Sequence, residues 1–468
     1  MPCPYRALCL RDEFRFPTLA CDSAALGLVS PRFIVMSQTN AKNVITLEID
    51  ALSYGPHGIG RLGGKAVMVP HTAPGDTVEA GIVESKERYA VGEMIRLIAP
   101  SPVRQTPLCP YVGACGGCSW QHLRYEAQLI AKQQSVEDAL RRIGKLDRFE
   151  LRPIIPSSNE YHYRRRIRLQ VDASRKLGFY GASSHHLVEI DSCAIAEDHL
   201  NRSLKSLRRW ARAIKTNIEH LEIITGDEPN QIVAVAQALD EFATQDKFIC
   251  KKLVAGDESG ISGVIFRGRD WRKVWGRPTI SVKLLSDCTL AVDADVFTQV
   301  NPDGNRRILQ QLLAAAEFQV GDRILELYSG AGNFTLPIAK RVDNVVAIEG
   351  HRPAVSAGKL NAQRSGIDNI RWICSPVPQA VARLKRRQEK FTKIILDPPR
   401  AGAKGIENDL SALGASKIFY VSCNPTTLAR DLAALTKQDY ELQIVQPIDL
   451  FPQTFHVEAL AVMERPSP

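Results

Sequence analysis

The sequence has no long hydrophobic run, no internal repeat and no tract of low complexity. No apolar stretch in its 468 residues comes near the roughly 20 residues that a membrane span needs. No secretory signal is evident, so we do not expect the eleven cysteines, an odd number, to form a disulfide framework. These absences argue against a membrane protein and against a disulfide-stapled secreted domain. We expect a cytoplasmic monomer that binds no membrane.

The charge balance suits a polyanionic partner without proving one. The chain has 60 Lys+Arg against 51 Asp+Glu, which gives a net charge of +9 and a pI of about 9.0. Basic residues cluster at 164–168, 208–212 and 385–387. Each cluster is as consistent with a solvated face as with a nucleic-acid contact.

The length predicts two or three domains, each large enough to bury a core. Residues 42–99 combine short alternating strands with glycine turns, which is typical of a small closed barrel of the OB type that binds oligonucleotides, or of a packing module. Apolar spacing predicts a helix over 123–143, with Leu129, Val136, Leu140 and Ile143 on one face. A mixed region continues to about 290, and strands and helices alternate from about 291 onward.

The first 35 residues show no strong periodicity and precede Met36, which is an alternative start. We therefore expect four segments. They are a weakly structured extension (1–39), a β-barrel (40–100), a central domain (101–290) and a cofactor-binding domain with a mostly parallel sheet (291–468).

Three polar motifs in the last segment each follow a short apolar run. They occupy residues 326–334, 397–400 and 422–425, and the last reads Ser-Cys-Asn-Pro. Such runs between helical stretches are typical of buried parallel strands, so we expect the motifs at one edge of the sheet, where open α/β sheets bind ligands. A lone buried cysteine is usually a small hydrophobic residue. Cys423, at a strand end beside a ligand cleft, is instead a candidate nucleophile.

The first of these motifs indicates a cofactor site. Gly330 and Gly332 let a ligand approach the backbone closely, but the third glycine of the dinucleotide fingerprint is missing, which disfavours NAD and FAD. The next apolar run, 345–348, ends in Glu349, whose carboxylate can accept hydrogen bonds from both ribose hydroxyls. This pattern is typical of S-adenosylmethionine sites, although Glu349 as a plain surface residue is the alternative.

A second candidate site consists of cysteines. Cys109, Cys115 and Cys118 have the spacing C-x5-C-x2-C, and Cys193 is the best candidate for a fourth ligand. Thiolates bind zinc as well as iron–sulfur clusters. Zinc sites commonly use two C-x2-C pairs and only one is present, whereas three close cysteines with a distant fourth suit a cubane cluster. The spacing alone leaves zinc, an iron–sulfur cluster and unligated thiols open.

Taken together, the motifs resemble those of the RNA uracil-C5 methyltransferases, which make 5-methyluridine in tRNA and ribosomal RNA. The resemblance covers roughly residues 40–468 and implies a multidomain α/β protein. Its parts would be a TRAM barrel, which the run at 58–61 resembles, a central α+β domain with a structural [4Fe-4S] cluster on the four cysteines and an RNA-binding role, and a C-terminal class I Rossmann-like methyltransferase domain.

The resemblance also implies contacts to S-adenosylmethionine beyond Glu349, from Gln299, Tyr328, Asn333 and Asp397. The chain departs from the family at Pro376, where relatives carry a short polar residue after the third strand. Backbone groups or Ser375 would then contact the adenine.

The chemistry requires a nucleophile and a base. Carbon 5 of uracil attacks a methyl sulfonium poorly unless a thiolate first adds to carbon 6, so we expect Cys423 to make this bond, with its pKa lowered by the helix that follows. A general base must then remove the carbon 5 proton. Glu458 precedes the last apolar run, which in methyltransferases runs antiparallel and so starts at the edge where the other strands end. The family pattern assigns the base to the same position; His456 is a weaker alternative.

We therefore expect methylation of a uridine flipped out of an RNA loop. The cluster-bearing relatives with this domain order are large-subunit ribosomal RNA enzymes, so 23S rRNA is favoured and tRNA is the alternative. Arg400 replaces the aromatic residue that ends the comparable loop of amino-group methyltransferases. The second Pro-Cys motif of an RNA cytosine-C5 methyltransferase is also missing, since no Pro-Cys pair follows the cofactor loop. A non-catalytic iron–sulfur RNA-binding protein is the remaining alternative, and the complete set of site residues argues against it.

Overall fold

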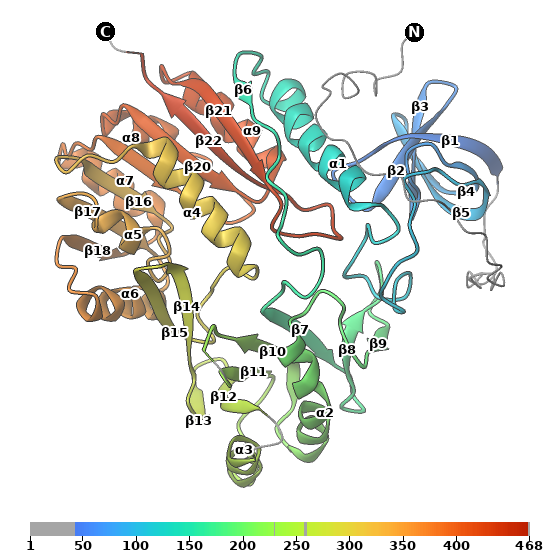
Figure 1. The fold of residues 1–468 in the computed structure, drawn as a ribbon, viewed down its shortest axis with the longest axis horizontal. Helices are drawn as coiled ribbons and strands as arrows, with labels where there is room; N and C mark the ends of the chain where they lie inside the picture. The colour runs from blue at the N-terminus through green and yellow to red at the C-terminus, as the bar shows by residue number, and fades with distance from the viewer. Residues whose placement is uncertain (1–42, 229, 257–259, 467–468) are drawn as a thin grey trace, which may run out of the picture. The chain divides into compact units, whose positions relative to one another are not determined.

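The computed structural model describes residues 43–228, 230–256 and 260–466 (Figure 1). The extension expected over residues 1–39 lies outside these ranges. Within them, every helix is too short or too polar to cross a bilayer.

The barrel predicted for residues 42–99 is confirmed. Its five strands close in the order β1-β2-β3-β5-β4 around a core that includes Leu47 and Val69. A Cβ atom at Gly60 would lie 2.2 Å from the carbonyl oxygen of Glu48, so only glycine lets the second strand lie this close to the first. The strands are β1 (Val44–Leu52), β2 (His57–Leu62), β3 (Lys65–Pro70), β4 (Thr77–Ser85) and β5 (Tyr89–Ala99).

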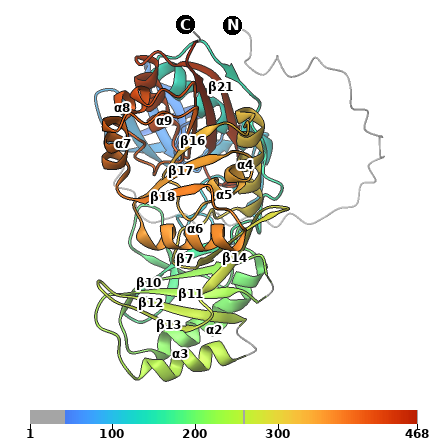
Figure 2. The ribbon, with the colours of Figure 1, turned by 90° about the vertical axis from the view of Figure 1, so that its left-hand side faces the viewer.

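A mixed seven-stranded sheet forms the central region, in the order β13-β12-β11-β10-β7-β8-β9. Two helices pack on the same side of it (Figure 2), and α2 buries Leu200, Leu204 and Leu207 at helical spacing. The elements are β7 (Arg166–Val171), β8 (Leu177–Tyr180), β9 (Leu187–Glu189), α2 (Asp198–Ala213), β10 (Ile218–Thr225), β11 (Ile232–Ala238), α3 (Asp246–Ala255), β12 (Ile261–Arg267) and β13 (Arg272–Gly276).

The C-terminal region contains the expected doubly wound sheet, in the order β18-β17-β16-β19-β20-β22-β21-β6. The five strands from β18 to β20 are parallel, and β22 runs antiparallel to both of its neighbours. The chain order reverses between β16 and β19, which is where such sheets open a ligand crevice. The strands are β6 (Glu150–Leu151), β16 (Arg323–Leu327), β17 (Asn344–Glu349), β18 (Ile370–Cys374), β19 (Lys393–Leu396), β20 (Lys417–Ser422), β21 (Glu441–Ile448) and β22 (Glu458–Glu464).

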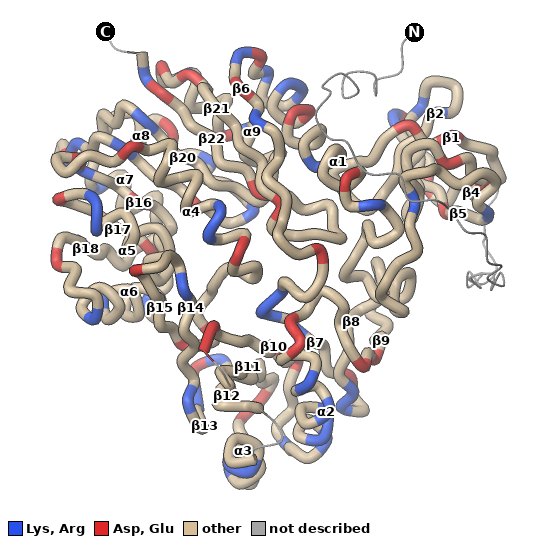
Figure 3. Tube along the Cα trace, in the orientation of Figure 1, with Lys and Arg blue, Asp and Glu red and all other residues tan. Residues whose placement is uncertain are grey.

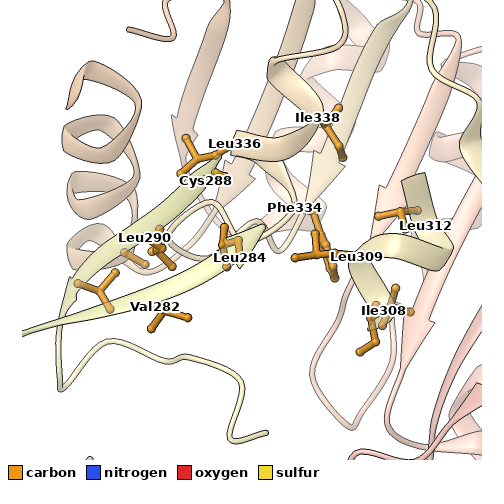
Figure 4. Packing of buried hydrophobic residues seen from close by; sticks show 14 of the residues in the cluster. Val282, Leu284, Cys288, Leu290, Ile308, Leu309, Leu312, Phe334, Leu336 and Ile338 are labelled. Carbon is orange, nitrogen blue, oxygen red and sulfur yellow. The ribbon is translucent and has the colours of Figure 1, made fainter. Parts of the chain in front are cut away.

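The hairpin of β14 and β15 packs against α4 and the glycine loop after β16. Its inward residues, including Val282, Leu284 and Leu290, pack with Leu309 and Phe334 in one apolar cluster (Figure 4). Phe334 belongs to the glycine loop after β16, so this packing fixes the far side of that loop. The elements are β14 (Thr279–Leu285), β15 (Cys288–Asp293), α4 (Pro302–Ala316), α5 (Thr335–Ala339), α6 (Arg352–Arg364), α7 (Val377–Arg386), α8 (Glu407–Ala412) and α9 (Pro425–Thr436).

The helix predicted over 123–143 is present but changes type. α1 (Tyr125–Asp138) continues into a π-helical turn, η2 (Ala139–Ile143). Val136 is buried as predicted, but Ile143 is 50% exposed, so its assignment to the buried face is wrong. The wider π turn rotates the residues after Asp138 away from the α-helical register.

Buried polar groups join α1 to the loop between β21 and β22. Lys132 Nζ lies 2.6 Å from Asp449 Oδ1, and both side chains are fully buried. The hydroxyl of Tyr125 donates to the other carboxylate oxygen at 2.9 Å, and the Gln128 side chain exchanges hydrogen bonds with Gln453. A buried charge is costly unless it is paired and hydrogen-bonded, so these contacts fix the loop over residues 449–457 against the helix.

Candidate active site

Strand register places Cys423 and Glu458 side by side. Ser422, the last residue of β20, pairs with Ala459 in antiparallel β22. Cys423 and Glu458 are the next residues outward from this last pair, and the influence of the Glu458 charge on the Cys423 thiol agrees with their proximity. On the other side, Glu458 pairs with Ile448 of β21. A sulfur and a carboxyl group thus meet at the carboxyl edge of the parallel strands.

Cys423 is half-buried in a ring of charged groups. Burial, with the negative charges of Glu458 and Asp397, raises the pKa of the thiol to about 11, although the nearby guanidinium of Arg400 acts in the opposite direction. The lowered pKa expected from the following helix is therefore wrong for the free protein. Desolvation outweighs that helix and the single guanidinium. The thiol needs activation when the substrate binds.

The loop that carries Arg400 is anchored on α9. The backbone carbonyl of Arg400 accepts hydrogen bonds from Asn424 Nδ2 at 3.2 Å and from Thr427 Oγ1 at 3.1 Å. Further along, the backbone N–H of Ala403 donates to the buried carboxylate of Asp431 at 2.7 Å. Asn424 also caps α9, since its side chain accepts from the N–H of the second helical residue. One asparagine therefore ties the cysteine loop to the Asp397–Arg400 loop.

The two candidate bases differ in protonation. Glu458 is 4% exposed and its Oε2 has no hydrogen-bond partner among the residues that the structure describes. Burial raises its pKa well above the ordinary value, with Asp397 adding to the effect and Arg400 opposing it. Burial lowers the pKa of His456 to about 4, with Arg400 contributing, so its imidazole is neutral and weakly basic. Glu458 is the stronger proton acceptor of the two once it is ionised.

The predicted cofactor residues surround the glycine loop after β16. Tyr328, half-buried, turns the chain with a φ of 62°, and Gly332 continues with a φ of 101° that disfavours any side chain. Glu349 ends β17, and its two carboxylate oxygens accept hydrogen bonds from the N–H of Gly330 at 3.1 Å and of His351 at 2.7 Å. Each oxygen keeps a free lone pair for a ligand hydroxyl.

Glu326 is a buried acid of this crevice that the sequence patterns did not single out. It is 1% exposed, on β16, and its Oε2 has no partner within the described residues. Burial raises its pKa to about 8, and the nearby charges of Asp397 and Glu349 add to this. Burial likewise raises the pKa of Asp397 to about 7. An acid inside an otherwise apolar strand was the available signal, because buried unpaired acids cluster at functional sites.

Two predicted cofactor residues, Asn333 and Gln299, lie near the start of α4. Asn333 forms a reciprocal side-chain pair with Asn305 of α4, at 2.8 and 2.9 Å, a partner that the sequence did not reveal. Gln299 is partly buried between β15 and α4, two residues before Asn301, whose side chain caps α4 by accepting from the N–H of Gly304. The start of α4 therefore orders the chain at both positions.

The chain after β18 offers a serine in place of the exposed Pro376. Ser375 is buried, and its N–H donates to the carbonyl of Glu349 at 3.0 Å. This hydrogen bond holds Ser375 beside the end of β17. Ser375 thus supplies a polar side chain one residue before Pro376.

The four predicted metal ligands share one neighbourhood. Burial raises the pKa of Cys118 to about 12, with contributions from the charges of Cys193, Cys115 and Cys109. The segment around Cys115 pairs with the chain near Gly181. Across the described ranges, no group of three or more His, Cys, Asp or Glu side chains is arranged as a metal site. Two residues after Cys118, the N–H of Trp120 donates to the carbonyl of Gln453, in the loop between β21 and β22.

Comparison with known proteins relates the whole described chain to one family. The family described as tRNA (Uracil-5-)-methyltransferase matches residues 124–466, and the TRAM domain matches residues 40–95. The 23S rRNA (uracil(1939)-C(5))-methyltransferase RlmD of Mannheimia succiniciproducens is 33% identical, covering 90% of this chain and 96% of that protein. RlmD of Vibrio parahaemolyticus is 32% identical, covering 90% and 95%.

A solved structure shares the fold. The tRNA (uracil-54, C5)-methyltransferase of Pyrococcus abyssi, in complex with S-adenosyl-L-homocysteine, superposes with a TM-score of 0.69 at 24% identity. The match covers 90% of this chain and 100% of that one.

Replacing Glu326 with glutamine should make stability less dependent on pH. The folded-state pKa of about 8 lies above the ordinary value of 4.5, so Glu326 contributes stability that is present below pH 4.5 and lost as the pH rises through 8. The urea midpoint of the wild type should fall more steeply than that of Glu326→Gln over this range. The exposed Glu93→Gln variant should follow the wild type, and parallel curves for all three would contradict the assignment.

Proposed function

This chain belongs to the tRNA (Uracil-5-)-methyltransferase family, and we propose that it transfers a methyl group from S-adenosylmethionine to carbon 5 of a uridine in 23S rRNA. The ribosomal target is supported by relatives named for that activity, which are 32–33% identical over nearly their full length. The same chemistry on tRNA is the second candidate. The observation that carries the catalytic proposal is the β20–β22 register, whose last pair, Ser422 with Ala459, is adjacent to both Cys423 and Glu458.

The reaction divides into addition, methyl transfer and elimination. The Cys423 thiol loses its proton to solvent water, and the sulfur bonds to carbon 6 of the uracil, which leaves an enolate with electron density at carbon 5. Carbon 5 takes the methyl group from the sulfonium donor. The base then removes the carbon 5 proton, the carbon 5–carbon 6 double bond re-forms and the thiolate leaves. One proton is released overall for each methyl group transferred.

Residues of the site fit these steps. Arg400, whose charge lowers the pKa of the Cys423 thiol, is the positive group that favours the thiolate when RNA excludes water from the cleft. Glu458 is assigned the carbon 5 proton, because its carboxylate, once ionised, is a stronger base than His456, whose pKa is lowered. Asp397 is near both regions, because its charge raises the pKa of Cys423, of Glu458 and of Glu326.

The methyl donor fits the crevice at the reversal of strand order. Glu349 offers free lone pairs to the ribose hydroxyls, and the glycines before α5 let the donor approach the backbone. The remaining assigned contacts are Gln299, Tyr328, Asn333 and Asp397. Asn333 would act while held by Asn305, and Ser375 with neighbouring backbone groups would supply the polar contact that Pro376 does not provide.

We also propose a [4Fe-4S] cluster on Cys109, Cys115, Cys118 and Cys193. The support is the donor set, because the four free thiols come from two segments and each of Cys115, Cys118 and Cys193 is influenced by the charge of other members of the set, although the described residues are not arranged as a metal site. Bound, the cluster would cross-link the two segments and supply structural stability. Methyl transfer requires no electrons, so no redox step is assigned to it. Zinc on the same thiols is the alternative outcome.

RNA binding is assigned to the barrel and the central region. The net charge of +9 attracts RNA, and Figure 3 shows Lys and Arg interspersed with Asp and Glu along the described trace. A TRAM barrel lies beside a site whose target base must leave its stack. Recognition of a folded RNA loop by shape agrees with this mixed charge pattern better than tracking of a long duplex does.

Glu349→Ala should weaken S-adenosylmethionine binding by roughly tenfold to a hundredfold. Loss of two ribose hydrogen bonds to a charged acceptor costs about 1.5–3 kcal/mol. Titration calorimetry measures the affinity directly. The control is Glu441→Ala, an exposed acid at the opposite end of the sheet, which should bind as the wild type does. Unchanged affinity in Glu349→Ala would remove this residue from the site.

Protein purified without oxygen should carry about four irons and four sulfides per chain. Cys115→Ala and Cys193→Ala should each lose the iron, because a cubane with three protein thiolates is labile, whereas exposed Cys374→Ala should retain it. Metal analysis and absorbance spectra give the readout. Stoichiometric zinc without iron would overturn the cluster assignment.

RNA containing 5-fluorouridine tests the covalent mechanism. Fluorine at carbon 5 cannot leave as a cation, so the wild type should form an RNA adduct that survives denaturation, seen as a shifted band. Cys423→Ala should form none, and Cys374→Ala should match the wild type. Glu458→Gln should accumulate the methylated adduct on ordinary RNA, unlike Glu464→Gln on the same strand. Methylation of uridine by Cys423→Ala would refute the mechanism.

A further inference from the structure

A tyrosine of the N-terminal barrel reaches the loop of the proposed nucleophile. Tyr54 lies in the turn between β1 and β2, and its hydroxyl donates a hydrogen bond to the backbone carbonyl of Cys423 at 3.0 Å. Its ring packs edge-on against Phe455, with 5.5 Å between ring centroids at 87°. Phe455 precedes Glu458 by three residues. One side chain therefore contacts both loops that carry the proposed catalytic groups.

Tyr54 is held in place from both sides. Within its turn, the N–H and hydroxyl of Ser53 both donate to the carbonyl of His57, at 2.9 and 3.0 Å, and the N–H of Gly55 donates to Ser53. The tyrosine ring packs against the apolar core beneath the parallel sheet. Its hydroxyl pKa is raised by burial and by the charges of Cys423 and Glu458, against the opposing charge of Arg400, which agrees with its hydrogen bond to the Cys423 loop.

We propose that Tyr54 is a positioning residue for methyl transfer, so that the TRAM barrel completes the active site as well as contacting RNA. This inference rests on the proposed function. The Cys423 carbonyl ends β20 beyond the last ladder pair, Ser422 with Ala459. Tyr54 supplies a donor to this carbonyl just beyond the end of the ladder, and thereby restricts the backbone that aims the sulfur. The effect is on the rate of bond formation at carbon 6, since Tyr54 acts through Cys423.

The test compares Tyr54→Phe, which keeps the ring and removes the hydroxyl, with Tyr89→Phe in the same barrel. The full-length holoprotein is mixed with RNA containing 5-fluorouridine, and adduct formation is followed over a range of RNA concentrations. Tyr54→Phe should slow the rate at saturating RNA by about twofold to tenfold, the factor that one net hydrogen bond contributes. The RNA concentration for half-maximal rate and the melting temperature should stay unchanged. Tyr89→Phe should match the wild type.

Two results would overturn the inference while leaving the proposed function intact. One is a wild-type rate in Tyr54→Phe, and the other is a change confined to the half-saturating RNA concentration, which would make Tyr54 an RNA contact. A third result would overturn the proposed function and this inference with it. This is the failure of the wild type to form any adduct with RNA that carries 5-fluorouridine at the target position.

Discussion

The antiparallel pairing of β22 with β20 is the constraint on which the site depends. It places the first residue of β22, Glu458, against Cys423 at the edge where the parallel strands end. A slip of one residue would turn Glu458 to the other face of the sheet, so the register has to be fixed. Ladder pairs on both sides of β22 fix it, together with the fully buried Lys132–Asp449 pair that holds the preceding loop.

Buried, unpaired acids distinguish this region from the rest of the core. The carboxyl groups of Glu326 and Glu458 each have an oxygen without a partner among the described residues. Burial disfavours the ionised form of such a carboxyl group, so it raises the pKa and destabilises the fold when the group is ionised. The site is thus arranged for reaction at some expense of stability, and well-paired networks such as the one around Asp449 offset the cost.

The sequence predicted the features that local pattern determines. Short apolar runs followed by polar motifs located the strands, and the antiparallel direction of the last strand located Glu458. The high pKa of Cys423 was not predictable, because it follows from burial among charges that come from separate strands. Nor were the partners Asn305 and Tyr54, since their contacts join residues 28 and 369 positions apart. The boundaries near residues 100 and 290 remain proposals, and β6 pairs with the C-terminal sheet from within the central segment.

The central claim is that this protein methylates carbon 5 of uridine in large-subunit ribosomal RNA. It is tested most directly by mass spectrometry of nucleosides from purified 23S rRNA and tRNA of a strain that lacks the gene, with the gene restored as the control. The account predicts that 5-methyluridine falls in 23S rRNA, is unchanged in tRNA and returns on restoration. An unchanged 5-methyluridine content in 23S rRNA would contradict it.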